Sequence, residues 1–263
     1  MIRALYTAAS GMSAQQSNLD TIANNLANSG TVGFRGRAMQ FQDMIYQNMI
    51  EPGSASSTNT TSAGIQIGLG TKPVSSEVIM TQGSFNETDN TLDLAIQGSG
   101  FFPVTLPNGT TAYTRAGNFS RNSQGQVVTP DGNMLTPSIT IPSTATNVTI
   151  SQYGVVSAQL PGQTTTTQLG TIQLATFANP GGLAALGSNL FQVTSASGNA
   201  ITDNPGGTSG MGTLQQGYLE NSNVDVTQEF VQMIMAQRAY ESSSKVIHVA
   251  DDMYSQVNNM VHS

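Results

Sequence analysis

The first 28 residues carry apolar side chains at the spacing of an amphipathic helix. Apolar positions recur at alternating steps of three and four residues, a seven-residue repeat with one polar break. The members are Ile2, Leu5, Ala9, Met12, Gln16, Leu19, Ala23 and Leu26. Gly30 and Gly33 follow, and Gly33 can adopt the positive φ that a chain needs on leaving a helix. The pattern predicts one helix over residues 2–28.

The last forty residues repeat this arrangement at the other end of the chain. Asp225 is a good N-cap, and Gln228 three residues later comes close to a capping box. The predicted helix has two apolar runs, Val226, Phe230, Met233, Gln237 and Tyr240, then Val246, Ala250, Met253, Val257 and Met260. The step between the runs is one residue short of seven, so the stripe shifts around the helix there.

Between the two helices the sequence is of β type. Short runs with alternating character predict strands at Leu92–Gln97, Phe101–Leu106, Thr110–Arg115, Asn147–Ile150, Val155–Gln159, Thr171–Phe177 and Asn189–Val193. Turn residues such as Asp131-Gly132 and Pro161-Gly162 separate them. The segment Glu51–Gly64 is built from small polar residues and is typical of an extended or flexible insertion.

These patterns predict an α+β fold in which the N- and C-terminal helices form a coiled-coil pair beside a central, irregular antiparallel β domain. We expect three regions along the chain. Residues 1–30 and 223–263 form a helical polymerisation domain, residues 31–70 form a connecting segment with the insertion, and residues 71–222 form a β-rich outer domain.

The N-terminal helix is marginal when it stands alone. Its five large apolar side chains contribute roughly 1.5–3 kcal/mol each when fully buried. Ordering each backbone residue costs about 1–2 kcal/mol, of which helical hydrogen bonds recover a part. Two such stripes can cover one another, which leaves further Met and aromatic side chains for neighbouring copies. Packing of both helices on the chain's own β domain stays open as an alternative, as does a membrane-surface helix, although the first helix carries only Arg3 as a basic residue.

Composition narrows the classes of function. Charged residues make up 9% of the chain, the net charge is −7 and no basic cluster occurs, so we expect no nucleic acid as a partner. A surface of short neutral polar side chains is cheap to bury against other copies. No cysteine is present, which excludes disulfides and thiolate chemistry. We expect no membrane insertion and no cleavable secretory signal.

Candidate chemistry is sparse. His248 with Asp251 and Asp252 has a spacing that a metal pair could use, but a solvated helix face accounts for it better because no third strong ligand is near. Glu87, Asp89 and Asp93 are candidates for the paired carboxylates of glycan cleavage, in a turn-rich segment without Trp. We therefore expect no catalytic residue, no metal and no cofactor. A secreted cell-wall hydrolase or an adhesin stays open as an alternative.

Several motifs resemble the flagellar rod and hook family. They are Ser10–Gln16, Ala23–Asn28 and Thr31–Arg35 at the start, Gln97–Phe102 and Ala112–Phe119 in the middle, and Ser222–Asp225 and Gln237–Glu241 at the end. They occur in order over nearly the whole chain. Tyr46–Gly70 is similar to an insertion typical of the distal rod branch, so a proximal rod or hook subunit is the second choice. The chain departs from the family pattern at Ser29-Gly30 and at Arg35, where many relatives have Lys.

The resemblance implies a structural subunit of the rod in the flagellar basal body, which spans the periplasm and transmits torque to the hook. The terminal helices would line an inner tube, the β domain would form the outer wall, and the insertion would keep the rod straight. Implied partners are other copies in a helical homopolymer, proximal rod subunits, hook protein, the surrounding P- and L-ring proteins and the flagellar type III export apparatus.

We expect the subunit contacts to be made by apolar and aromatic side chains near the two chain ends and by asparagines where the first helix ends. The asparagine amides either form hydrogen bonds in a packed wall or only cap the helix. The expected contact residues are Ile2, Leu5, Met12, Leu19, Asn24, Asn25, Leu26, Asn28, Phe34, Phe230, Met233, Tyr240, Val246, Met253, Val257 and Met260.

Overall fold

The computed structural model describes residues 2–50, 55–56, 59–60, 64–162, 165–207 and 210–261. The chain divides into two compact units. The first contains Met1–Leu26, Arg37–Glu77 and Asp225–Ser263, and the second contains Ala27–Gly36 and Val78–Val224. The chain therefore passes between the units four times. The expected boundaries of the three regions stay a prediction.

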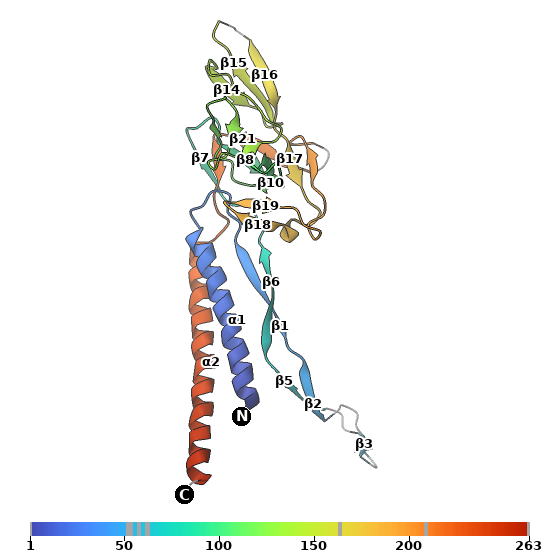
Figure 1. Ribbon diagram of the computed structural model, residues 1–263, viewed down its shortest axis with the longest axis vertical. Helices are drawn as coiled ribbons and strands as arrows, with labels where there is room; N and C mark the ends of the chain where they lie inside the picture. The colour runs from blue at the N-terminus through green and yellow to red at the C-terminus, as the bar shows by residue number, and fades with distance from the viewer. Residues whose placement is uncertain are drawn as a thin grey trace. The chain divides into compact units, whose positions relative to one another are not determined.

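Two long helices form most of the first unit. Helix α1 spans Ile2–Ala27 and α2 spans Val226–Val261. The Asp225 carboxylate accepts hydrogen bonds from the backbone N–H groups of Thr227 at 2.9 Å and Gln228 at 3.3 Å, as expected of an N-cap. Figure 1 shows the helices side by side and antiparallel. The end of α1 meets the start of α2, because Asn25 bonds to Glu229.

A long two-stranded ribbon completes the first unit. Strand β1 (Arg37–Asp43) pairs with β6 (Thr71–Val78), and β2 (Tyr46–Ile50) pairs antiparallel with β5 (Ile65–Gly68). Two-residue strands β3 (Ala55–Ser56) and β4 (Asn59–Thr60) pair farther along. Much of the expected flexible insertion, residues 51–54, 57–58 and 61–63, lies outside the described residues.

The second unit is built from short antiparallel strands. Its largest sheet has the order β11-β12-β13-β9-β10-β19-β18, with strands Ser120–Arg121, Val127–Val128, Met134–Leu135, Phe102–Thr105, Thr111–Thr114, Leu190–Gln192 and Ala184–Gly187. A three-stranded sheet contains β14 (Asn147–Ile150), β15 (Val155–Gln159) and β16 (Thr166–Thr171). Three pairs complete it, β17 with β20 (Leu174–Thr176, Ile201–Asp203), β8 with β21 (Leu94–Gln97, Thr213–Gln216) and β7 with β22 (Phe85–Glu87, Tyr218–Glu220). A short 3-10 helix spans Pro180–Gly182.

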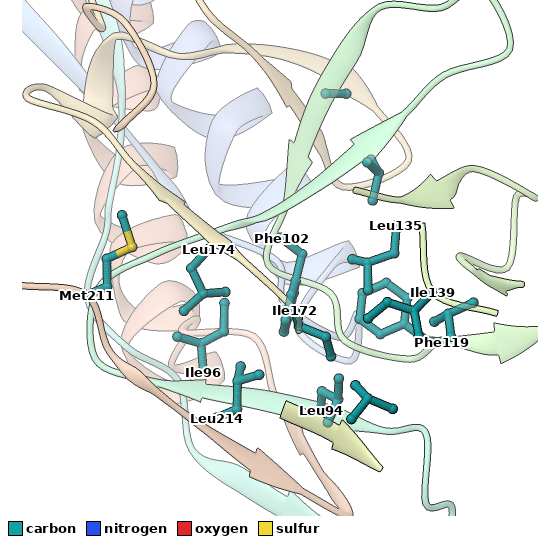
Figure 2. Packing of buried hydrophobic residues seen from close by; sticks show 14 of the residues in the cluster. Leu94, Ile96, Phe102, Phe119, Leu135, Ile139, Ile172, Leu174, Met211 and Leu214 are labelled. Carbon is teal, nitrogen blue, oxygen red and sulfur yellow. The ribbon is translucent and has the colours of Figure 1, made fainter. Parts of the chain in front are cut away.

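The core of the second unit lies where these sheets meet (Figure 2). Phe102 and Phe119 pack edge to face with ring centroids 5.1 Å apart, and Leu94, Ile96 and Leu174 are almost fully buried around them. A second cluster gathers Phe101, Tyr113, Phe177 and Phe191 with neighbouring apolar residues. Terminal helices that pack together and a central antiparallel β domain confirm the predicted α+β class.

Candidate assembly surface

The buried residues of α1 are two alanines, one isoleucine and one asparagine. Ala8, Ala14, Ile22 and Asn25 are at most 8% exposed. The large apolar side chains of the stripe predicted from the sequence are less buried than these residues, since Leu5, Met12, Leu19 and Leu26 are all half-buried. The side chain of Ile2 lies outside the described residues. The structure therefore leaves part of the large apolar stripe available for further contacts.

The face of α2 that meets α1 has a regular seven-residue repeat. Glu229, Ala236, Ser243 and Ala250 follow one another at this interval, and both alanines are at most 4% exposed. A Cβ placed on Gly11 of α1 would lie 3.5 Å from Ser243 Oγ. Small residues on both helices thus allow the backbones to approach closely. Most of the large apolar side chains of α2 lie outside this contact and are exposed.

Asn25 forms a polar junction between α1, β1 and α2. Its Nδ2 donates to the Arg37 carbonyl at 2.8 Å and to Glu229 Oε1 at 3.0 Å, and its Oδ1 accepts from the Arg37 N–H at 2.9 Å. Glu229 Oε2 is buried and accepts no hydrogen bond in the described part of the chain. Of the other expected amides, Asn24 is exposed, whereas the Asn28 Oδ1 accepts from the Thr31 hydroxyl at 3.2 Å in a turn. The junction joins the end of α1 to the start of β1 and to the first turn of α2.

The outer faces of α2 expose large apolar side chains over its whole length. Those at least 37% exposed are Val226, Phe230, Val231, Ile234, Met235, Tyr240, Val246, Val249, Met253, Tyr254, Val257 and Met260. They include every expected α2 contact residue except Met233, which is half-buried. A single exposed apolar residue is ordinary, but a continuous set along one helix is typical of an interaction surface.

The ribbon of the first unit also exposes large apolar side chains, which were not predicted as contact residues. Ile45 is 83% exposed, Met49 is 56% exposed and Tyr46 is 51% exposed. All residues from 41 to 50 are exposed. The run of large residues from Phe41 to Ile50 was a usable sequence signal, because such residues rarely gather in a solvated loop.

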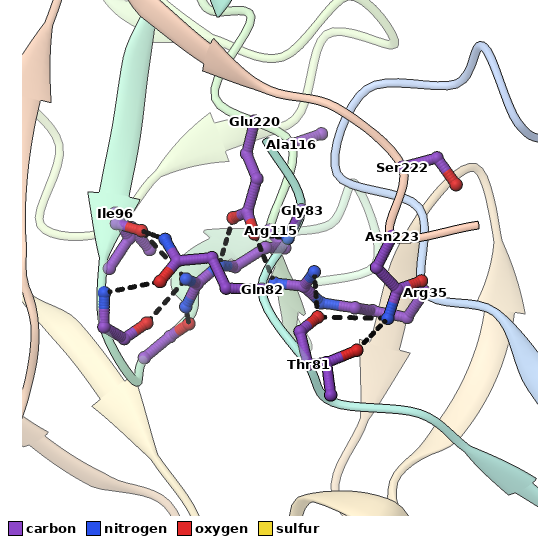
Figure 3. A network of polar contacts seen from close by, with 12 residues as sticks. Arg35, Thr81, Gln82, Gly83, Ile96, Arg115, Ala116, Glu220, Ser222 and Asn223 are labelled. Atoms are coloured by element: carbon purple, nitrogen blue, oxygen red, sulfur yellow. Dashed lines mark hydrogen bonds and ion pairs between the residues drawn. The ribbon is translucent and has the colours of Figure 1, made fainter. Parts of the chain in front are cut away.

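The exit from α1 belongs to the second unit and is held by a buried charged cluster. Gly33 has a φ of 68°, as predicted, and its N–H donates to the Glu220 carbonyl at 2.8 Å. Arg35 Nη2 lies 2.8 Å from Glu220 Oε1, and Arg115 Nε lies 2.7 Å from Glu220 Oε2 (Figure 3). Phe34, an expected contact residue, directly precedes Arg35 in the sequence and is half-buried. One carboxylate therefore pairs with two guanidinium groups.

Backbone carbonyl groups accept further hydrogen bonds from the two arginines. Arg35 Nη1 donates to the Thr81 carbonyl at 2.8 Å. Arg115 donates to the carbonyls of Ile96, Gly98 and Gly100. Burial lowers the pKa of the Arg115 guanidinium, and the attraction of Glu220 opposes this effect. The Glu220 carboxylate and the two guanidinium groups thus form a buried set of charges that is bonded to itself and to backbone carbonyls.

Asn223 extends the cluster to the chain that enters α2. Its Oδ1 accepts from the Gly36 N–H at 2.8 Å, and its Nδ2 donates to the carbonyls of Ile79 at 2.8 Å and Thr81 at 3.0 Å. Segments 33–36, 79–83 and 220–223 are therefore bonded to one another inside the second unit. Sequence reasoning singled out Arg35 and the Ser222–Asp225 motif, but it missed Arg115 and Glu220 as partners.

Candidate sites of other kinds find little support in the described residues. His248, Asp251 and Asp252 are exposed on α2, and no group of three or more potential metal-ligating side chains occurs within the described ranges. No helix in the described part of the chain is both long and apolar enough to cross a bilayer.

Three family models match segments of the chain in order. Residues 5–35 match the flagella basal body rod protein model, residues 95–158 match the D1 domain of flagellar hook protein FlgE/F/G, and residues 215–260 match the C-terminal model of flagellar basal body rod FlgEFG protein. These matches define the class as bacterial flagellar rod and hook proteins.

Curated relatives narrow the class. The chain is 51% identical over 261 residues to flagellar basal-body rod protein FlgG of Caulobacter vibrioides, covering 98% of this chain and 99% of that protein. It is 46% identical to the FlgG protein of Borreliella burgdorferi, with 99% of each chain covered. It is 29% identical to flagellar hook-basal body complex protein FlhP of Bacillus subtilis, covering 99% of this chain and 100% of that protein. The chain belongs to the family of the flagellar basal-body rod protein FlgG.

Proposed function

We infer that the chain is a structural subunit of the distal rod of the bacterial flagellum, where many copies form a straight, rigid helical shaft. The observation that carries this inference is the large apolar surface of α2, which the chain's own α1 leaves exposed. A soluble monomer gains nothing from such a surface, whereas a polymer buries it in every copy. Membership in the FlgG family supports the same role.

The exposed apolar surface of α2 offers many contributions of modest size to assembly. Full burial of a Val, Leu, Ile, Phe or Met side chain contributes about 1.5–3 kcal/mol, so a half-exposed one still has about 1 kcal/mol to gain. Phe230, Ile234 and Met235 are 48%, 51% and 65% exposed on the first turns of α2 alone. Many modest contacts in parallel are suited to a shaft that transmits torque, because no single contact carries the load.

We further propose that the chain acts by assembly and catalyses no reaction. In this scheme residues 1–30 and 223–263 form the polymerisation domain, residues 31–70 connect it, and residues 71–222 form the outer wall. The partners are other copies, proximal rod subunits at one end and hook protein at the other, with P- and L-ring proteins around the shaft. The flagellar type III apparatus exports the chain, and the insertion after Tyr46 keeps the rod straight.

The test is assembly of the purified full chain, followed by sedimentation and electron microscopy over a range of concentrations. Phe230→Asp places a charge in the apolar face and should raise the critical concentration at least tenfold, because desolvating a carboxylate costs several kcal/mol. Gln232→Asp is the matched control, since Gln232 is an exposed polar residue of the same helix. Both variants should keep the circular dichroism spectrum of the parent. Rods formed by Phe230→Asp at the parent concentration would contradict the proposed surface.

A further inference from the structure

The second unit contains a cavity of about 310 Å³ beside the buried charged cluster shown in Figure 3. Its walls combine apolar side chains with both arginines of that cluster, and they include Arg35, Arg115, Met80, Phe101 and Phe177. All of its lining residues belong to the second unit. A volume of this size lies near the lower limit of pockets that hold small organic molecules. The cavity therefore has the size of a small-ligand site and lies against buried charge.

Arg35 uses only part of its hydrogen-bonding capacity. A guanidinium group carries five N–H donors. Among the described residues, Arg35 donates two hydrogen bonds, from Nη1 to the Thr81 carbonyl and from Nη2 to Glu220. Its Nε–H and one N–H on each Nη have no acceptor in that part of the chain, although the side chain is only 3% exposed. Buried donors without an acceptor are costly, so the cavity beside Arg35 is a place where an acceptor is missing.

The charged cluster also has an excess of positive charge. Arg35 and Arg115 contribute two positive charges and Glu220 contributes one negative charge, which leaves a net charge of +1. Burial lowers the pKa of the Arg115 guanidinium, Glu220 raises it, and repulsion from Arg35 lowers it further. No aspartate or glutamate occurs among the described residues that line the cavity. An anion in the cavity would therefore neutralise charge that the chain itself leaves uncompensated.

The apolar walls decide which kind of anion fits. Phe101 and Phe177 are each 5% exposed and pack edge to face with ring centroids 5.8 Å apart, and Met80 lines the same cavity. A carboxylate can accept two parallel hydrogen bonds from a guanidinium fork, and an apolar body attached to it would cover the aromatic wall. An inorganic anion would satisfy the guanidinium group but leave the apolar walls in contact with water.

We propose that this cavity binds a small organic carboxylate, with its oxygens on Arg35 and its apolar body against Met80 and Phe101. The ligand supplies both the acceptor and the negative charge that the cluster lacks. The inference goes beyond the proposed rod function and requires no second copy of the chain. It can therefore be tested on the dilute monomer, and its outcome is independent of rod assembly.

The test is a titration of the isotope-labelled full chain with sodium benzoate, followed by amide NMR shifts at constant ionic strength with sodium chloride as the balancing salt. Benzoate should cause saturable shifts at Ser99, Gly100 and Phe177, which line the cavity, with a Kd of about 1 mM or lower. Benzamide has a similar shape but no charge, so it should bind at least about tenfold more weakly. Equal binding of benzoate and benzamide, or the absence of saturable shifts, would overturn the proposal.

Three variants test the assigned contacts. Arg35→Lys keeps the charge but loses the planar fork, so it should weaken benzoate binding at least about fivefold, and an unchanged affinity would contradict the role of Arg35. Thr176, which is half-buried and lines the cavity, allows a test that leaves both arginines in place. Thr176→Glu should abolish benzoate binding and raise the urea midpoint above that of the matched control Thr176→Gln, because a carboxylate of the chain then occupies the site. A lower midpoint in Thr176→Glu than in Thr176→Gln would show that the cavity does not favour a carboxylate.

Discussion

Removal of the Glu220 carboxylate should destabilise the second unit strongly. The carboxylate is fully buried, pairs with Arg35 and Arg115 at 2.8 and 2.7 Å, and accepts the Gly83 N–H at 2.9 Å. Glu220→Ala leaves the guanidinium groups of Arg35 and Arg115, whose side chains are 3% and 4% exposed, without a counter-charge. Breaking a buried ion pair by removing one partner costs about 3–5 kcal/mol. For a unit of this size the melting temperature should fall by about 6–20 °C.

The assay is urea unfolding of the dilute monomer, followed by circular dichroism and by amide hydrogen exchange in β8 and β9. These strands supply core residues beside the cluster, so their exchange reports the opening of the second unit. Glu87→Ala is the control, because Glu87 is an exposed carboxylate of the same unit and its loss should change stability by no more than about 0.5 kcal/mol. The slope of the unfolding free energy with urea should stay unchanged.

A loss below about 1 kcal/mol for Glu220→Ala would refute this reasoning. It would mean that the backbone carbonyls around Arg35 and Arg115 already compensate both charges, or that water enters the cluster. An equal loss in Glu87→Ala would show that the assay responds to net charge and not to the buried cluster.

Two further predictions concern glycines. Gly33→Ala should destabilise the second unit by more than about 1 kcal/mol in urea unfolding, because φ is 68° and the new Cβ would lie 2.6 Å from the Ala116 nitrogen. Gly30→Ala is its control, since a Cβ at Gly30 meets nothing within 4 Å. Equal loss of stability in the two variants would contradict the steric argument. Gly11→Ala should slow amide exchange in α1 and stabilise it by about 0.5–1 kcal/mol, because its Cβ fits 3.5 Å from Ser243 Oγ; faster exchange would show that the seam has no such room.

Elements with a strong local signal were predicted well. The Asp225 cap and the apolar runs after it placed the start of α2 within a residue. Strands β14 and β15 have the predicted bounds, and in β15 half-buried and fully buried residues alternate as the pattern required. In these segments the side chains that decide the structure are neighbours in the sequence.

Features that depend on distant or unusual partners were not predictable in the same way. The ribbon strand Tyr46–Ile50 is exposed at every position, so no burial on one face imposes an alternating pattern. The contact between α1 and α2 is made by small residues such as Gly11 and Ala236, and a search for regularly spaced large apolar side chains does not find them. The partners of Glu220 lie 185 and 105 residues away in sequence, at Arg35 and Arg115, and no local spacing announces a pair of that kind.

The order of segments in the first unit restricts when it can form. Asn25 and Glu229, which join α1 to α2, are 204 residues apart, whereas the second unit is almost continuous from Val78 to Val224. Closing so long a loop is unfavourable until the intervening chain has become compact. A chain that is made or released from its N-terminus therefore completes its β unit first and its helix pair last. The large apolar faces of α2 therefore become available to other copies only when the last residues of the chain are free.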